Sequence, residues 1–351
     1  MRILVADDSA LFRNLIAKAI TEIPNVELIA VAVDGKQALE KILLLKPDLV
    51  TLDIEMPELS GIEVLRQLKQ QQQQLETGVI MVSTHTREGG ALTIEALGLG
   101  AFDFITKPTL STAEANLLKI KEDISRVIKA YTHKVQIKKI LEKQGTNKKS
   151  PPLVNRPPKC QLIAIGISTG GPHALAEFLP LLPGDLNVPI LIVQHMPPLF
   201  TESLAKGLDQ KCKLRVKEAA DGDLVLPNKI YIAPGGKQMK MVTNAANNFC
   251  LRICDDPPEN NCRPAVDYLF RSLAHNHSAP VLALIMTGMG SDGVLGLKLL
   301  KRHGHFVIAQ DEASCVVFGM PKEAMSAGVV DATHALADFP AVITKIIRGY
   351  P

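Results

Sequence analysis

A serine between glycines follows an apolar run in the second half of the chain, within LIAIGISTGG at residues 162–171. A tight turn between a strand and a helix is the setting of a nucleophilic serine, and also of a glycine-rich loop that binds phosphate. A nucleophilic serine needs a base, and that base needs an orienting group. Ser168 is therefore a candidate nucleophile whose partners must lie elsewhere in the sequence.

His195 and Asp292 are the partners that the pattern favours. His195 directly follows the apolar run PILIVQ, and Asp292 follows VLALIMT and a glycine-rich turn. Because parallel strands end at one edge of their sheet, residues that follow three such strands would meet there. Asp311, after HFVIAQ, is a competing carboxylate, but the glycines around Asp292 allow a closer approach to a cleft. Asp292 could also cap the helix that follows it.

The phosphate-loop alternative fits the same turn less well. GISTGG lacks the lysine of G-x-x-x-x-G-K-[ST], and Ser168 replaces the second glycine of G-x-G-x-x-G. The chain order Ser, His, Asp also differs from the Ser, Asp, His order of α/β-hydrolases, so that fold is not predicted. Among the other histidines of this half, His173 is expected on the helix that follows the turn. The others are expected at the surface: His275, His277, His303 and His305.

Carboxylates in the first half of the chain indicate a second site. Asp7 and Asp8 follow the first predicted strand, and Asp53 follows the third. In a doubly wound sheet of order 2-1-3-4-5, the ends of these neighbouring strands flank the ligand-binding crevice. Three carboxylates repel one another unless a cation intervenes, and an all-oxygen site suits Mg²⁺. Ser83 and Lys107, after the fourth and fifth strands, would reach the same rim, and the set fits phosphoryl chemistry.

Alternating strands and helices must position both sites. Short β-branched runs lie at residues 2–6, 27–31, 48–52, 79–83 and 102–106, and again at 161–166, 189–194, 229–233, 281–287 and 305–310. Amphipathic patterns between them are typical of parallel sheets covered by helices on both faces. We therefore predict a five-stranded α/β domain at residues 1–120 and a larger doubly wound α/β domain at 159–351. A linker rich in Lys, Arg and Pro, at residues 121–158, would join them.

Composition narrows the class of protein. Of the 351 residues, 46% are hydrophobic and 21% are charged, which is typical of a globular protein, and a net charge of +3 gives no argument for nucleic acid. No signal peptide is recognisable and no apolar run approaches the ~20 residues that cross a bilayer, so we expect a cytoplasmic protein without membrane insertion. The cluster Cys250, Cys254 and Cys262 has no histidine pair at zinc-finger spacing, which favours free thiols.

The motifs VADDSALFR, TLDIEMPELSG, MVST and FDFITKP resemble the signature of response-regulator receiver domains. The resemblance implies a flavodoxin-like fold in which Asp53 accepts a phosphoryl group from a histidine kinase. It also implies that Asp8, Asp53 and the backbone carbonyl of Glu55 hold Mg²⁺. Asp7 would complete the acid pocket.

The same resemblance implies roles for residues at the rim of this pocket. Ser83 and Lys107 would contact the phosphate, and Phe104 matches the aromatic position that changes rotamer on activation. His85, two residues after Ser83, departs from the family pattern.

The motifs GISTGGP, VQHMP, YIAPGG, RPAVDYLF, MTGMGSDG and QDEASCVVFGMP resemble the catalytic domain of chemotaxis protein-glutamate methylesterases, the CheB family. The resemblance implies hydrolysis of γ-glutamyl methyl esters on the cytoplasmic helices of chemoreceptors, and deamidation of selected glutamines, with no cofactor for the esterase step. Ser168 would be the nucleophile, His195 the base and Asp292 its orienting group. The oxyanion hole would be formed by backbone N–H groups near Thr169 and Gly170 or, alternatively, near Met289.

The family resemblance further implies control of the esterase by the receiver. The unphosphorylated receiver would cover the esterase cleft, and phosphorylation of Asp53 would shift the population toward an active arrangement. The expected partners are the kinase and the chemoreceptors, with no nucleic acid, and a monomer is the default. The alternative is a response regulator whose second half only binds a protein. A DNA-binding output is disfavoured because no helix-turn-helix pattern or basic recognition helix is recognisable.

Overall fold

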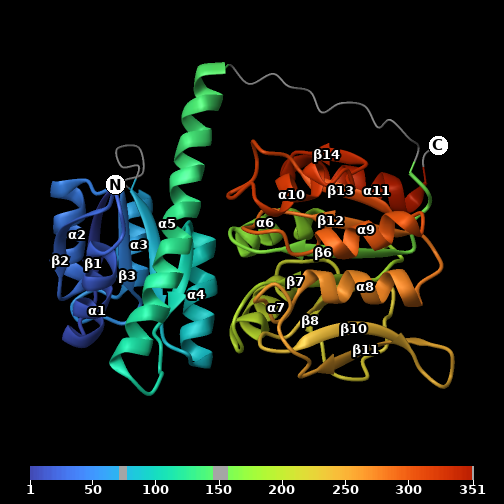
Figure 1. Ribbon diagram of the computed structural model, residues 1–351, viewed down its shortest axis with the longest axis horizontal. Helices are drawn as coiled ribbons and strands as arrows, with labels where there is room; N and C mark the ends of the chain where they lie inside the picture. Colours follow the sequence, from blue (N-terminus) through green and yellow to red (C-terminus); the bar gives the residue numbers. More distant parts are fainter. Residues whose placement is uncertain (71–76, 145–156, 350–351) are drawn as a thin grey trace. The chain divides into compact units, whose positions relative to one another are not determined.

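The computed structural model describes residues 1–70, 77–144 and 157–349. For residues 137–144 it describes the backbone alone. The chain divides into two compact units, Met1–His133 and Lys134–Pro351, which are described separately (Figure 1). The helix α5 (Ala113–Gln144) runs through the predicted boundary at residue 120 and through the first part of the predicted linker. Residues 145–156 of that linker lie outside the described residues.

The first unit contains the predicted five-stranded parallel sheet, in the predicted order β2-β1-β3-β4-β5. Its strands are β1 (Arg2–Ala6), β2 (Glu27–Ala32), β3 (Leu49–Asp53), β4 (Gly78–Ser83) and β5 (Asp103–Thr106). Its other helices are α1 (Ala10–Thr21), α2 (Gly35–Leu45), α3 (Gly61–Gln70) and α4 (Arg87–Leu99). Ala6 pairs with Leu52 across β1 and β3, so the aspartates that come next on each strand lie at the same edge of the sheet.

The second unit is built on a seven-stranded parallel sheet of order β14-β13-β12-β6-β7-β9-β8. Its strands are β6 (Leu162–Ile167), β7 (Ile190–Gln194), β8 (Arg215–Glu218), β9 (Lys229–Ile232), β12 (Val281–Ile285), β13 (Phe306–Gln310) and β14 (Ala332–His334). An antiparallel pair, β10 (Gln238–Thr243) and β11 (Phe249–Cys254), forms a separate small sheet. Its helices are α6 (Gly171–Phe178), α7 (Phe200–Asp209), α8 (Val266–Asn276), α9 (Val294–Arg302), α10 (Met320–Ser326) and α11 (Phe339–Arg348), with short 3₁₀ turns at Leu179–Leu181 and Leu336–Asp338.

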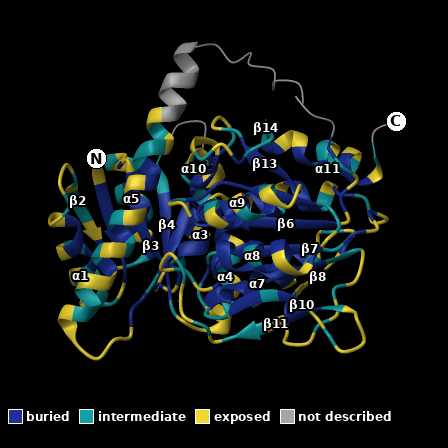
Figure 2. Ribbon diagram, turned by 45° about the vertical axis from the view of Figure 1, so that its right-hand side comes forward, coloured by how far each residue is buried: buried dark blue, intermediate teal, exposed yellow. Residues whose placement is uncertain are grey.

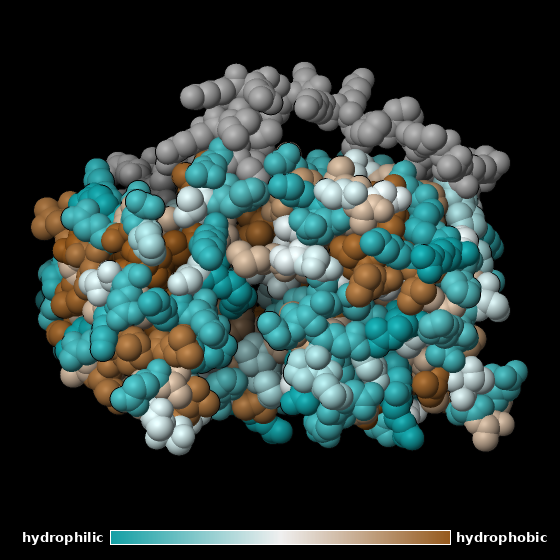
Figure 3. Space-filling view, viewed as in Figure 1, coloured by the Kyte–Doolittle hydropathy of each residue, from teal (hydrophilic) through white to brown (hydrophobic). Residues whose placement is uncertain are grey.

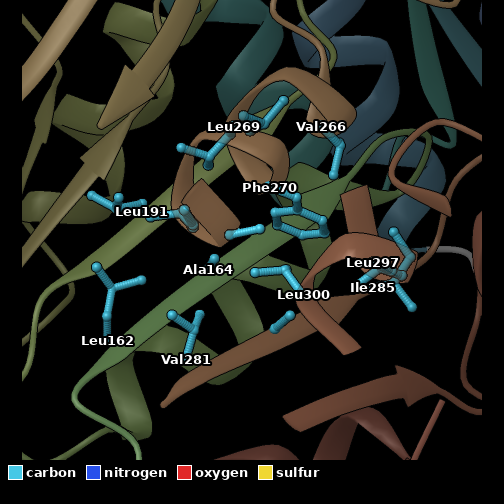
Figure 4. Close-up of a cluster of buried hydrophobic side chains, with 14 of the residues drawn as sticks. Leu162, Ala164, Leu191, Val266, Leu269, Phe270, Val281, Ile285, Leu297 and Leu300 are labelled. Carbon is cyan, nitrogen blue, oxygen red and sulfur yellow. The ribbon is translucent and has the colours of Figure 1, made fainter. Parts of the chain in front are cut away.

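Burial explains why these apolar runs form central strands. Every residue of β6, β7, β12 and β13 is buried, as expected for parallel strands covered on both faces (Figure 2). On one face, Phe270 of α8 and Leu300 of α9 belong to a buried cluster that includes Ala164 of β6 (Figure 4). This packing holds the strand ends, and therefore the residues that follow them, in fixed relative positions.

The surface is mainly hydrophilic on the face shown in Figure 3, where hydrophobic residues form scattered groups. Exposed leucines occur in both units, including Leu11, Leu44 and Leu295. None of the helices in the described ranges is long and apolar enough to cross a membrane.

Candidate functional sites

Ser168 and His195 leave neighbouring strands at the same edge of the second sheet. Ile167 at the end of β6 pairs with Gln194 at the end of β7, and the two candidate residues come next on each strand. The N–H of His195 donates to the carbonyl of Ile167 at 3.2 Å, and the N–H of Ser168 donates to the carbonyl of Thr287 after β12 at 3.0 Å. Ser168 is only 6% exposed. The turn is thus tied to both adjacent strands.

Gln194 fixes the backbone of both candidate residues. Its Nε2 donates to the carbonyl oxygen of Ser168 at 3.0 Å and to that of His195 at 3.2 Å. Its Oε1 is buried, and a Cβ at Gly171 would lie 1.9 Å from it, so the start of α6 requires glycine for this close approach. This role of Gln194 is not predicted from the sequence, although a glutamine at the end of the apolar run PILIVQ is a visible signal.

The structure brings His195 and Asp292 into direct contact. Nε2 of His195 is hydrogen-bonded to Oδ2 of Asp292 at 2.8 Å. The aspartate also accepts from the backbone N–H groups of Val266 (2.7 Å) and Asp267 (3.0 Å), and from Nδ2 of Asn260 (2.9 Å). Asp292 therefore caps the start of α8 and not the following helix α9, where the sequence would place such a cap.

The competing carboxylate, Asp311, has other partners. It accepts from the backbone N–H of Ser314 at 2.9 Å and from its hydroxyl at 2.6 Å. Within the described part of the chain, no hydrogen bond or ion pair joins Asp311 to His195. The geometry thus favours Asp292 as the residue that orients the imidazole.

Electrostatics stabilise a charged pair at this position. Burial opposes ionisation of Asp292, but the hydrogen bond to His195 and the N–H donors of α8 outweigh it and lower the pKa of the aspartate. Burial also opposes the charged imidazole, but hydrogen bonds to Asp292 and then to Cys262 raise the pKa of His195 to about 9. The Sγ of Cys262 lies 3.6 Å from Nδ1 of His195. The residue types would have suggested neither Asn260 nor Cys262 as neighbours of this pair.

Ser168 is related to the His195–Asp292 pair by its place at the same sheet edge and not by a hydrogen bond. Among the described residues, its Oγ forms no hydrogen bond, so the Ser–His contact is not made in this state. Catalytic hydrogen bonds are often long before substrate binds. Because Asp292 occupies Nε2, a proton leaving Ser168 would have to reach Nδ1 of His195.

The backbone around Ser168 offers hydrogen-bond donors. Across the described residues, the N–H groups of Thr169, Gly170 and Met289 donate to no protein acceptor, whereas the N–H of Ser168 is taken by the carbonyl of Thr287. These three N–H groups are the oxyanion-hole candidates named from the sequence. They could stabilise a developing oxyanion, which is the charge that such donors serve in acyl transfer.

The surface prediction for the remaining histidines is partly wrong. His173, His275 and His303 are exposed, but His277 and His305 are buried. His305 lies at the start of β13, and its Nδ1 accepts the backbone N–H of Val281 at 3.1 Å. A polar flanking sequence therefore did not indicate exposure here.

The first unit gathers its predicted acids around one lysine. Carboxylate oxygens of Asp7, Asp8 and Asp53 all lie within 4.8 Å of one another. Nζ of Lys107 lies 2.6 Å from Oδ2 of Asp53 and 3.1 Å from Oδ2 of Asp7. Three carboxylates against one ammonium leave an excess of negative charge, and among the described residues the buried Oδ2 of Asp7 has only this ion pair with Lys107 as a polar contact. These residues fit a divalent cation with oxygen ligands.

Burial has the largest effect on the pKa values of Asp53 and Asp7 in this acid pocket. Burial, with the nearby charge of Asp7, raises the pKa of Asp53 to about 6 against the hydrogen bond from Lys107. Burial likewise raises the pKa of Asp7. Glu55 is exposed and lines an open groove of about 750 Å³ together with Asp8.

The two remaining rim residues are turned into the protein. The hydroxyl of Ser83 accepts from Oγ1 of Thr93 at 2.9 Å and lies 3.2 Å from the carbonyl of Gly89, both in α4. The side chain of Phe104 is buried at 8% exposure. For the serine to contact a phosphoryl group at Asp53, its bonds to α4 would have to change.

Comparisons with known proteins agree with this two-part architecture. A family profile described as response regulator receiver domain matches residues 3–120, and one described as CheB methylesterase matches residues 163–343. The fold and both sites thus define a response regulator whose receiver is joined to an α/β enzyme domain. The chain belongs to the CheB methylesterase family.

Relatives of known name cover the whole chain. A protein-glutamate methylesterase/protein-glutamine glutaminase of Desulfotalea psychrophila is 46% identical over 100% of this chain and 99% of its own length. One of the same name from Bacillus subtilis is 41% identical over 99% of each chain. The crystal structure of the Thermotoga maritima CheB methylesterase catalytic domain, at 40% identity and a TM-score of 0.52, covers 53% of this chain and 98% of its own. These names do not support the alternative of a non-enzymatic output domain.

Proposed function

We propose that this protein is a phosphorylation-regulated serine esterase that hydrolyses methyl esters of glutamate side chains on the cytoplasmic domains of chemoreceptors. Deamidation of selected glutamines is a second activity of the same site. The names of the full-length relatives support the substrate class. The observation that carries the chemistry is the 2.8 Å contact between His195 and Asp292 beside the turn that bears Ser168.

The proposed reaction uses Nδ1 of His195 as the base. The Oγ of Ser168 attacks the ester carbonyl while its proton passes to Nδ1, and Asp292, bound at Nε2, stabilises the imidazolium. The imidazolium then protonates the methoxy oxygen as its bond to the carbonyl carbon breaks, so that methanol leaves and a glutamyl ester of the serine remains. Water, deprotonated by the same nitrogen, hydrolyses that ester and regenerates the hydroxyl. For a glutamine substrate the leaving group is ammonia.

Three backbone donors are available for the tetrahedral intermediate. The unbonded N–H groups of Thr169 and Gly170 belong to the serine's own turn, and that of Met289 belongs to the loop after β12. Each donor that reaches the oxyanion is expected to contribute about 3 kcal/mol of transition-state stabilisation.

The proposed regulatory step takes place in the receiver. Asp53 accepts a phosphoryl group from a histidine kinase. Asp8, Asp53 and the carbonyl of Glu55 would hold Mg²⁺, which would supply charge neutralisation for phosphoryl transfer. Lys107, already 2.6 Å from Asp53, would hold a phosphate oxygen. Phosphorylation raises the esterase activity of the second unit. This function places the protein in the cytoplasm, where the kinase and the receptor helices are found.

Methanol release from methylated receptor membranes tests the esterase. We expect Ser168→Ala to reduce the rate by about 10³-fold or more, since it removes the nucleophile. Ser203→Ala is the matched control, because this serine lies in α7 and its hydroxyl bonds, among the residues that the structure describes, only to the carbonyl of Leu199. Equal rates for wild type and Ser168→Ala would exclude the proposed reaction.

A further inference from the structure

Cys262 lies against His195 although 67 residues separate them in the sequence. The thiol is half-buried, and its Sγ lies 3.6 Å from Nδ1. Reciprocal backbone hydrogen bonds between Glu259 and Cys262, at 3.1 and 2.8 Å, fix the turn that carries it. Asn260 of the same turn donates to Asp292. The cysteine is therefore held beside the imidazole by the same turn that supports the aspartate.

The separation of these two atoms matches that of two ligands on one metal ion. Zinc binds cysteine sulfur at ~2.3 Å and histidine nitrogen at ~2.0–2.1 Å in tetrahedral geometry, which places the two ligand atoms about 3.5 Å apart. The observed distance between Sγ of Cys262 and Nδ1 of His195 is 3.6 Å. The ion would need no large movement of either side chain.

Asp292 supplies the outer support that such a histidine ligand requires. Metal-bound histidines commonly donate their other ring N–H to a carboxylate, which fixes the tautomer and orients the ring. The contact of Nε2 with Asp292 at 2.8 Å has this form. The aspartate oxygens are already engaged by the N–H groups of α8 and by Asn260, so it is an orienting group here and not a ligand.

We propose that Cys262 Sγ and His195 Nδ1 form a binding site for a thiophilic divalent metal ion of the Zn²⁺ class, and that metal binding inhibits the esterase. Inhibition rests on the proposed function of His195 as base, because the metal occupies the lone pair that would accept the proton of Ser168. Binding displaces the thiol proton of Cys262, and any proton on Nδ1, into solvent. Water molecules complete the coordination, so the inhibition is reversible by chelation.

Ligand chemistry keeps this site separate from the receiver pocket. The pocket of Asp7, Asp8 and Asp53 offers oxygen ligands, which suit Mg²⁺. The thiolate and imidazole of Cys262 and His195 select softer ions. Millimolar Mg²⁺ should therefore occupy the receiver without protecting or blocking the esterase site.

Cobalt absorption tests the site without relying on enzyme activity. The full-length protein is titrated with Co²⁺ in the presence of Mg²⁺, and a near-ultraviolet band from sulfur-to-cobalt charge transfer is recorded. Cys262→Ser removes the sulfur ligand, whereas Cys212→Ser is the control, since Cys212 is also half-buried and free. We expect the band in wild type and Cys212→Ser and its loss in Cys262→Ser. A band that persists in Cys262→Ser, or is absent from wild type, overturns the site.

Zinc inhibition tests the consequence, with each variant compared to its own metal-free rate of methanol release. We expect Zn²⁺ to inhibit the wild-type enzyme and EDTA to restore its activity. Half-maximal inhibition of Cys262→Ser should need more than about tenfold more Zn²⁺ than that of wild type. Cys262→His restores a nitrogen ligand and should regain zinc inhibition without the sulfur band, which also excludes misfolding as the cause. Equal zinc sensitivity of wild type and Cys262→Ser overturns the proposal. Absence of ester hydrolysis without metal refutes the proposed function alone, because the cobalt band still reports the site.

Discussion

Asn260 is one of four donors to the carboxylate of Asp292, and it is the only side chain among them besides the imidazole. Asn260→Ala should lower kcat/KM by about tenfold, because a hydrogen bond to a charged group contributes about 1.5 kcal/mol. Asn261→Ala is the matched control, since the two asparagines have positive φ angles of 52° and 59° and lose the same backbone preference. Similar losses in both variants would show that backbone strain, and not support of Asp292, controls the rate.

The protonation state of His195 sets the expected pH dependence. Its pKa is raised to about 9 by Asp292 and Cys262 against the effect of burial, so the imidazole is mostly charged, and unable to act as a base, below that pH. We expect kcat/KM of the chelator-treated enzyme to rise between pH 7 and 9 and then level off. Asp292→Asn should lower the apparent pKa, because it removes the main interaction that favours the charged form. Spontaneous ester hydrolysis is subtracted with Ser168→Ala, and a flat wild-type profile over this range would contradict the prediction.

The sequence identifies residues that follow strands better than those that contact them from elsewhere. Ser168, His195 and Asp292 stand next to apolar runs, so strand geometry alone predicts that they converge. Asn260 and Cys262 lie in a turn between two other elements, and nothing local indicates that this turn approaches His195. Their roles depend on tertiary packing.

The start of helix α6 requires a residue without a side chain at position 171. A Cβ at Gly171 would collide with Oε1 of Gln194, which is buried and whose Nε2 holds the carbonyls of Ser168 and His195. Gly171→Ala should therefore reduce esterase activity by about tenfold or more and destabilise the fold by about 1–3 kcal/mol. Gly98→Ala in α4 is the control, because its added Cβ would have no atom within 4 Å. This variant should leave esterase activity unchanged and slightly stabilise the protein. Methanol release and thermal unfolding measure both effects, and wild-type behaviour of Gly171→Ala would contradict the argument.

The amino end of β13 makes the second unit sensitive to acid. Burial, with the nearby charges of His277 and His303, lowers the pKa of His305 from 6.5 to about 4. The unfolded chain binds a proton at higher pH than the folded one, so stability is complete above pH 6.5 and is lost as pH falls toward 4. We expect the free energy of unfolding to drop by about 1–2 kcal/mol between pH 7 and 5 from this group. In urea unfolding, His305→Asn should flatten that dependence and the exposed control His275→Asn should not; identical slopes would refute it.

The strands differ in how well the sequence predicts them, for a physical reason. Those at the centre of each sheet are buried on both faces and appear as continuous apolar runs. The strands β8 and β14 and the pair β10–β11 were missed, because they are short, lie at an edge or carry alternating polar residues. Composition also fails to show how far helix α5 extends, because the helix continues past residue 120 into a stretch rich in Lys and Arg that suggests a linker.

The two candidate sites lie in separate compact units of one chain. The receiver pocket offers oxygen ligands and a lysine, whereas the esterase site offers a serine, an imidazole and a thiol. Neither site borrows a residue from the other unit in the proposed mechanisms. Activity and its regulation should therefore be separable by dividing the chain, as the crystallised catalytic domain of a relative suggests.

Residues 157–351 alone should hydrolyse receptor methyl esters at a rate that does not respond to a phosphodonor. The full chain should respond to acetyl phosphate and Mg²⁺ with a several-fold rise in rate, because only it contains Asp53 and can shift between inactive and active populations. Asp53→Asn should abolish the response, and Asp123→Asn is the control, since the only ion pair of this half-buried carboxylate within the described ranges is with Lys119 in α5. A response in Asp53→Asn, or in the isolated second unit, would mean that the phosphodonor acts outside the acid pocket. An unresponsive full chain that is nevertheless phosphorylated would instead refute coupling between the two units.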